Sequence, residues 1–99
     1  MRIDIVHCTT PDAIKARGDY DHDLLRFTDG NVTLVARSYT SIPLEASFLG
    51  IEMGGSPTFI TRADFDRPLF REAAAHLRTL GKTSLLWLNV ETGGYEAVP

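Results

Sequence analysis

The chain has 99 residues, of which 43% are hydrophobic and 23% charged, and its formal net charge is −3. This length suits one core and a single domain over 1–99, and the composition excludes a disordered chain and a bilayer-spanning segment. The mild acidity excludes a uniformly basic nucleic-acid binder, and the single cysteine, Cys8, is typical of a reducing compartment, so we expect a cytoplasmic protein without an export signal.

The N-terminal segment predicts a strand and then a short helix. Residues 2–8 suit a strand, in which the neighbours His7 and Cys8 point to opposite faces. The segment 11–17 follows a threonine suited to an N-cap, begins with proline and precedes a glycine, which together favour a short helix. Because His7 and Cys8 face apart, they cannot form a nucleophile–base pair.

The segments 24–28 and 31–39 give the clearest local signal, which is a β-hairpin. They flank Asp29-Gly30, and Asp-Gly is a dipeptide that favours a two-residue turn. We expect a type I′ turn, in which both central residues have positive φ.

Two further strands are predicted before the main helix. Residues 45–53 are apolar at alternate positions and end at the glycine- and proline-containing segment 54–57, which breaks regular structure. Phe59 and Ile60 favour a brief strand over 58–61.

The main helix is predicted over 68–80. A proline in its first turn and Gly81 just after it are typical of helix ends. The apolar residues fall within an arc of about 140°, a width normal for a helix that lies on a sheet. We expect this face to belong to the core, with Leu69, Phe70, Ala73, Ala74, Leu77 and Leu80 buried.

The C-terminal part predicts a second hairpin. Residues 84–90 are apolar on both faces, so we expect a strand that is covered on both sides. A tight turn at 92–94 then returns the chain as a strand over 95–98. The complete order predicts an α+β fold, with a mostly antiparallel sheet of about five or six strands and two helices, 11–17 and 68–80, packed on one face.

The most suggestive chemical pattern is a run of alternating carboxylates before the first hairpin. Its spacing matches the start of a calcium-binding loop, but Leu24 stands where that motif needs glycine and Gly30 where it needs glutamate. The simplest interpretation is a solvated acidic loop, and among functional interpretations we favour docking of a basic protein over a metal site. The residues are Asp19, Tyr20, Asp21, His22 and Asp23.

A second charged surface is predicted on the main helix. Four basic residues fall within an arc of about 60° on the helical wheel if the helix extends slightly at both ends. Such a stripe is usually the solvent-facing side of a helix, although it suits an anionic ligand or an acidic partner as well. The four residues are Arg67, Arg71, Arg78 and Lys82.

Common signatures of catalysis are absent from the sequence. It contains no G-x-S-x-G, H-E-x-x-H, C-x-x-C or nucleotide-binding glycine motif. The spacing of His7, His22 and His76 does not demand a zinc site. We therefore expect no catalytic residue, no metal and no cofactor.

These observations favour a non-enzymatic protein-binding domain. Its most specific form is a small inhibitor or immunity-type protein that blocks a partner enzyme or toxin through the acidic loop, with the basic stripe as a second surface. The expected partner is a protein, and neither nucleic acid nor a membrane is expected. One alternative is a small enzyme or ligand-binding domain that uses His7 or His22 with nearby acids. Another is a homo-oligomer that pairs sheet edges or buries Tyr39 and Phe48.

Overall fold

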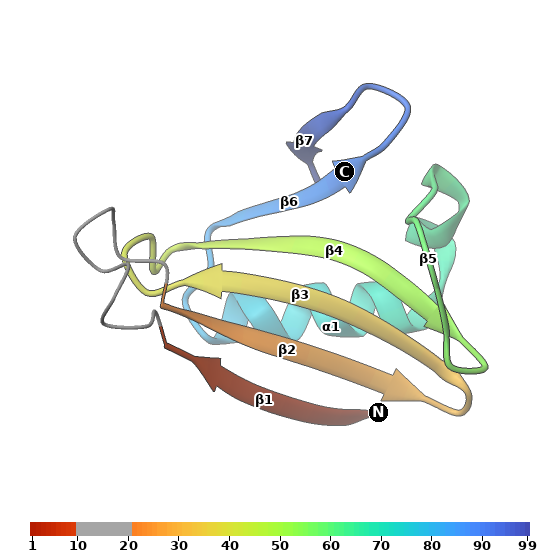
Figure 1. Cartoon of the computed structure of the whole chain (residues 1–99), viewed down its shortest axis with the longest axis horizontal. Coiled ribbons are helices and arrows are strands. Elements are labelled where there is room, and N and C mark those ends of the chain that lie inside the picture. Colours follow the sequence, from red (N-terminus) through yellow and green to blue (C-terminus); the bar gives the residue numbers. More distant parts are fainter. Residues whose placement is uncertain (10–20) are drawn as a thin grey trace.

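The computed structural model describes residues 1–9 and 21–99 and shows a sheet with one long helix across one of its faces (Figure 1). The helix predicted over 11–17 lies outside the described residues. The fold is α+β, as the order of elements predicts. Within the described part, no helix has the length and apolar character needed to cross a bilayer.

The described residues form seven strands, a 3-10 helix and an α-helix. The strands are β1 (Arg2–Cys8), β2 (His22–Asp29), β3 (Val32–Tyr39), β4 (Glu45–Met53), β5 (Ser56–Thr58), β6 (Ser84–Asn89) and β7 (Gly94–Ala97). The 3-10 helix is η2 (Arg62–Asp66), and the α-helix is α1 (Pro68–Thr79).

The sheet is antiparallel except at one pair of strands. Its order is β1-β2-β3-β4-β6-β7, and β5 also pairs with β4. The outer edge of β4 is therefore shared, with β6 along residues 45–48 and β5 along residues 51–53. Since β4 and β6 run parallel, the chain between them must cross over, and it does so through β5, η2 and α1.

The first hairpin is confirmed, but the predicted turn type is wrong. The strands β2 and β3 pair up to Asp29 and Val32, so Gly30 and Asn31 are the two central residues of the turn. Gly30 has φ 60°, whereas Asn31 is not among the residues with positive φ. A single positive φ at the first central residue is the pattern of a type II′ turn, which glycine at that position favours.

The strand predicted over 45–53 is confirmed as β4. The brief strand predicted over 58–61 is wrong in its bounds, because β5 spans Ser56–Thr58 and includes neither Phe59 nor Ile60. Two glycines with positive φ, Gly54 (59°) and Gly55 (84°), turn the chain back directly against β4. Pro57 is tolerated in β5 because this three-residue strand pairs along one edge only.

The helix α1 packs on the sheet through the predicted apolar face, with one exception. Leu69, Phe70, Ala73, Ala74 and Leu77 are buried, and Phe70 lies against Phe48 with ring centres 4.5 Å apart. Leu80 was expected in this face, but it is 49% exposed. The reason is that α1 ends at Thr79 and the chain turns away at Gly81, where φ is 88°.

The core lies between α1 and the sheet. The strands contribute Leu25, Phe27, Leu34, Ala36, Ala46, Phe48, Ile51, Leu85 and Trp87, and Ile60 completes it beside the helix residues. Phe48 is fully buried in this core. The expectation that Phe48 would lie in a dimer interface is therefore wrong.

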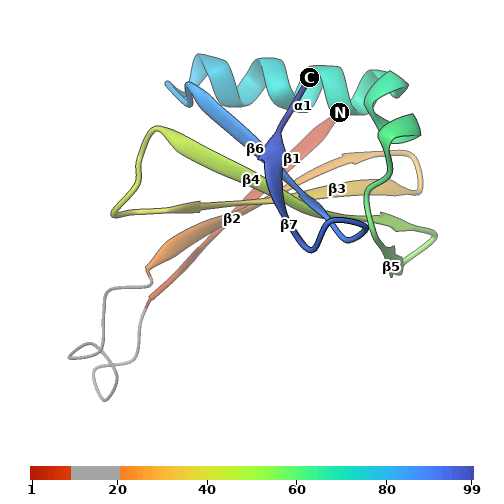
Figure 2. The same cartoon turned by 90° about the horizontal axis from the view of Figure 1, so that it is seen from above.

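The strand β6 is covered on one face only. Leu85 and Trp87 are buried on the side of α1, while Leu86 and Leu88, which point the other way, keep part of their surface exposed. The prediction of burial on both sides is wrong, because α1 lies on one side of the sheet and no other described element crosses the centre of the other side (Figure 2).

The 3-10 helix η2 is held by Asp64, whose side chain is buried. Its carboxylate accepts hydrogen bonds from the backbone N–H of Thr61 at 2.8 Å and from Nε of Arg67 at 2.8 Å. Burial raises the pKa of Asp64, but the Thr61 and Arg67 hydrogen bonds and the Arg67 charge outweigh it and leave the pKa below the ordinary value of 3.8. The charged Asp64 therefore joins Thr61, which precedes η2, to Arg67, which precedes α1.

Candidate functional site

The acidic segment is only partly within the described residues, because Asp19 and Tyr20 lie outside them. Asp21 directly precedes β2, and its carbonyl accepts a hydrogen bond from the backbone N–H of Thr40 at 2.9 Å. His22 and Asp23 belong to β2, so they point to opposite faces of the sheet. Docking through this segment stays a prediction.

The two end residues of the basic stripe form hydrogen bonds within the chain. Arg67 donates to Asp64, and Nζ of Lys82 donates to the carbonyl oxygen of Pro43 at 2.6 Å. Between them, Arg71 and Arg78 lie exposed on the helix. The two end residues therefore have structural partners, which leaves the two middle residues as the accessible part of the stripe.

His7 and His22 lie on the adjacent strands β1 and β2, whereas His76 lies on α1. Nδ1 of His7 and Oδ1 of Asp23 lie 2.7 Å apart, and both side chains are about half exposed. His76 lies at the margin of the core, with its ring centre 6.0 Å from that of Phe27. Among residues 1–9 and 21–99, no three His, Cys, Asp or Glu side chains are grouped so that they could hold a metal ion.

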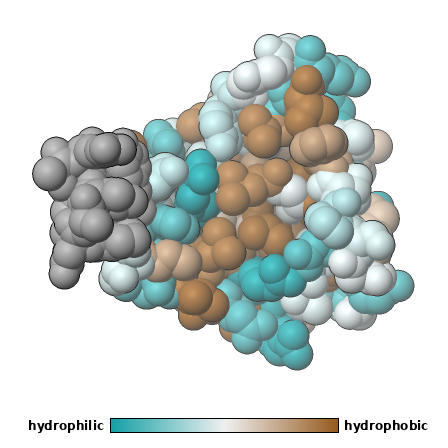
Figure 3. Space-filling model, in the orientation of Figure 1, coloured by the Kyte–Doolittle hydropathy of each residue, from teal (hydrophilic) through white to brown (hydrophobic). Residues whose placement is uncertain are grey.

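The most distinctive surface is the sheet face turned away from α1, which we call the open face. Strand pairing fixes its members, because residues opposite one another in a ladder share a face. Figure 3 shows this face with a broad hydrophobic area over the middle strands. The apolar residues on it are Val6, Leu24, Val35, Leu49, Leu86, Leu88 and Tyr95.

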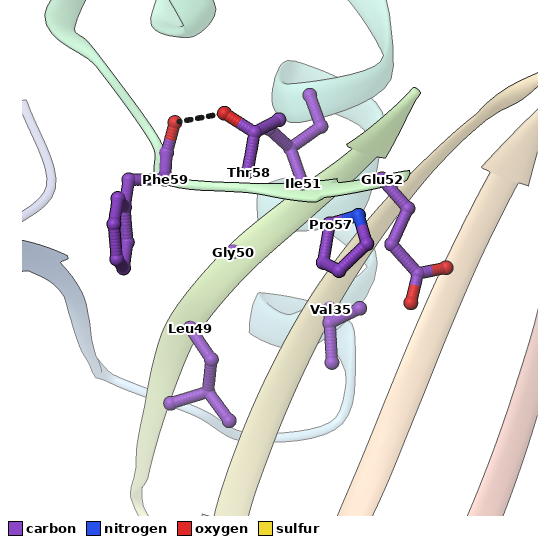
Figure 4. A pocket seen from close by; sticks show the side chains of 8 residues that line it. All are labelled: Val35, Leu49, Gly50, Ile51, Glu52, Pro57, Thr58 and Phe59. Carbon is purple, nitrogen blue, oxygen red and sulfur yellow. Dashed lines mark hydrogen bonds between the residues drawn. The ribbon is translucent and has the colours of Figure 1, made fainter. Parts of the chain in front are cut away.

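A pocket of about 390 Å³ opens on this face between the strands β3 and β4 on one side and β5 with Phe59 on the other. Figure 4 shows the side chains of Val35, Leu49 and Phe59 around it. Phe59 is 60% exposed. Gly50 forms the floor, and a Cβ atom there would lie 3.1 Å from the carbonyl oxygen of Thr58. The pocket therefore depends on the close approach of β5 to β4.

Arg37 stands on β3 near the middle of the open face, between two tyrosines. Its Cζ lies 4.6 Å from the ring centre of Tyr39, and its Nη2 donates a hydrogen bond to Oη of Tyr95 at 3.1 Å. Because Tyr95 belongs to β7, the contact passes over β4 and β6, and the small Ser47 opposite Arg37 leaves room for it. Arginine and tyrosine are the residues most often enriched where interfaces concentrate their binding energy.

The charges of the open face balance, but two of them have no ion-pair partner. Arg2 pairs with Asp4 at 3.1 Å, and Arg26 binds both carboxylate oxygens of Glu52. Two charged side chains remain, and among the described residues neither forms an ion pair. These two residues are Arg37 and Glu45. They lie on adjacent strands, because Arg37 of β3 stands opposite Ser47 of β4 in the sheet and Glu45 is two residues before Ser47.

Sequence reasoning missed the open face, although a signal for it exists. The pattern of 84–90 shows apolar residues on both faces, and Leu24 and Leu25 show the same in β2. Double-sided apolar strands need two covering layers, whereas the described elements supply one, α1. The sequence contains more apolar strand residues than one covering helix can bury, and this excess indicates an exposed apolar face.

Comparisons with protein-family models, curated proteins and solved structures find no match to this chain.

Proposed function

We propose that this chain is a non-enzymatic protein-binding domain and that the open face is its binding surface. The observation that carries the proposal is the broad apolar area on the face opposite α1. Proteins in water rarely expose contiguous apolar patches larger than a few hundred Å². Where such patches occur, they commonly mark interaction sites.

The chemistry of the open face supports the same proposal. Its apolar side chains surround Arg37 and two tyrosines, and the pocket beside Phe59 is large enough to receive a side chain of a partner. The charged residues lie largely toward its margins, on β1, β2 and the ends of β4. An apolar centre with a polar rim is the usual composition of an interface.

The narrower proposal of an inhibitor or immunity-type protein rests on the acidic segment 19–23. A basic partner enzyme or toxin would be steered toward these carboxylates by long-range attraction. Replacement of Asp21 and Asp23 by asparagine would slow association with such a partner and reduce its dependence on salt.

Site-specific photo-crosslinking in the source cells tests the proposed function. A benzophenone amino acid at position 88 lies on the open face, whereas the same group at position 72 is exposed on α1 outside the basic stripe and serves as the matched control. We expect a defined polypeptide to crosslink from position 88 in fixed stoichiometry and to be lost when Val35→Asp is introduced. The proposal fails if position 88 captures nothing, or if both positions capture the same set of proteins.

A further inference from the structure

We infer that the partner of the open face is a second copy of this chain, related to the first by a two-fold axis. In this dimer Arg37 of each copy pairs with Glu45 of the other. The inference rests on the proposed function and names its partner. It is argued from the charges of the open face, from its area and from the placement of its apolar residues.

The first argument is charge complementarity. Three arginines and three acids stand on the open face, and two of each sign already pair within the chain. A partner that is only basic or only acidic would satisfy either Glu45 or Arg37 and leave the other buried without a counter-charge, which is costly. A two-fold axis that passes between these two residues satisfies both, because each contact then occurs twice.

The second argument concerns the remaining contacts of Arg37. Its guanidinium has five N–H donors, and the described residues accept from one nitrogen, Nη2, through Tyr95. The Nε–H is buried without a hydrogen-bond partner. The group is therefore held in place by Tyr39 and Tyr95 but is not neutralised by them. A pre-positioned cation of this kind binds a carboxylate at a low cost in side-chain entropy.

The third argument is area. The six strands of the main ladder have between four and nine residues, and at about 3.3 Å per residue and about 4.8 Å per strand they give a face of about 600–700 Å² in projection. Side chains that stand on the face raise its accessible area toward the about 800 Å² per partner that stable interfaces bury. Val35, Leu49 and Leu86 lie on the middle strands of this area, where contact between two copies would exclude water.

The net charge of −3 does not oppose this association strongly. The open face itself is neutral, and at physiological ionic strength charges beyond about 8 Å are screened. Among the described acids, Asp66 and Glu72 are exposed in η2 and α1, away from the open face, so their charges remain in water when two open faces meet.

Sedimentation equilibrium over a wide concentration range tests the inference with four proteins: the unmodified chain, Arg37→Glu, Glu45→Arg and the double variant. The unmodified chain is expected to dimerise. Each single variant places two like-charge pairs in the interface and is expected to weaken the dimer by about 10-fold to 100-fold. The double variant exchanges the two charges and is expected to recover most of the lost affinity.

Two controls make the result decisive. The variant Glu72→Arg reverses an exposed charge on α1, outside the basic stripe and away from the open face, and is expected to leave dimerisation unchanged. Circular dichroism and thermal unfolding show whether each variant is folded, and Arg37→Gln replaces Arg37→Glu if the latter unfolds. A monomer at every concentration overturns the inference, as does a dimer that tolerates the single variants or is not restored in the double variant.

The crosslinking experiment separates this failure from failure of the proposed function. If position 88 captures a different polypeptide while the chain sediments as a monomer, the second copy is excluded and the protein-binding function stands. If position 88 captures nothing and the chain is monomeric, both are wrong.

Discussion

Arg37 and Tyr95 are joined by a hydrogen bond of 3.1 Å although they lie 58 positions apart in the chain. The contact links the third strand of the sheet to its last one over the open face. It connects the N-terminal strands to the C-terminal hairpin independently of the core on the other side.

Replacement of Tyr95 by phenylalanine tests the strength of this link. The change removes the acceptor of Arg37 Nη2 and keeps the ring. Because the bond is exposed, the expected loss in the free energy of unfolding is modest, about 0.5–1 kcal/mol in urea titrations. Tyr39→Phe is the matched control, because it keeps the ring that contacts Arg37 and should leave the free energy of unfolding nearly unchanged. A larger effect of Tyr39→Phe than of Tyr95→Phe would contradict this assignment.

Removal of the Asp64 charge is expected to destabilise the fold. Asp64→Asn keeps the size of the side chain but weakens its contacts with Thr61 and Arg67, at an expected cost of about 1–3 kcal/mol in the free energy of unfolding. Asp66→Asn, at an exposed position in the same 3-10 helix, is the matched control and should change stability by less than about 0.5 kcal/mol.

The same residue predicts a dependence of stability on pH. The pKa of Asp64 is lower in the folded chain than its ordinary value of 3.8, so its contribution is present above that value and is lost as pH falls through the lowered folded pKa. The difference in unfolding free energy between the unmodified chain and Asp64→Asn should therefore be constant near neutral pH and shrink below about pH 4. If this difference in unfolding free energy grew on acidification, the pKa of Asp64 would be raised rather than lowered in the folded chain, and the prediction would be wrong.

Gly50→Ala is expected to loosen β5. The added Cβ would lie 3.1 Å from the backbone oxygen of Thr58, which is held by the pairing of Thr58 with Ile51. We expect a loss of about 0.5–1.5 kcal/mol and faster hydrogen exchange in β5. Gly94→Ala is the control, because a Cβ there meets no atom within 4 Å and its φ is not positive. Equal effects of the two changes would contradict the close approach.

Alanine substitutions of Leu77 and Leu80 test where the buried face of α1 ends. Leu77 is fully buried, so Leu77→Ala should cost about 2–5 kcal/mol of unfolding free energy. Leu80 is about half exposed beyond the last helical residue, and Leu80→Ala should cost about 0.5 kcal/mol or less. Chemical denaturation of both variants measures the contrast, and similar losses would place Leu80 in the core after all.

Local sequence patterns predicted the regular elements well. Residues 45–53 form a strand with the predicted bounds, and the main helix ends one residue before the predicted position. Both depend on periodicity and on glycine or proline at the ends, which are properties of neighbouring residues. Leu80 was misplaced because the same periodicity continues past the residue where the helix stops.

Features that depend on distant residues could not be predicted in this way. The strand β5 exists because Gly50 lets the backbone of Thr58 approach β4, and a single sequence does not reveal that contact. The open face could not be located from the sequence, because the apolar pattern of residues 84–90 is the same whether one or two layers cover the sheet. The candidate site is therefore mostly a product of the tertiary arrangement, with Arg37 and Tyr95 as its clearest example.

The parallel pairing of β4 with β6 also has a consequence for biosynthesis. The strands β1 to β4 pair with their neighbours along the chain and leave the ribosome first, so they can associate early. The helix that covers them and the strand that extends them are made later, after the crossover segment 54–83. Until then the nascent sheet exposes apolar side chains on both of its faces, so this interval is the time at which chaperones would be needed most.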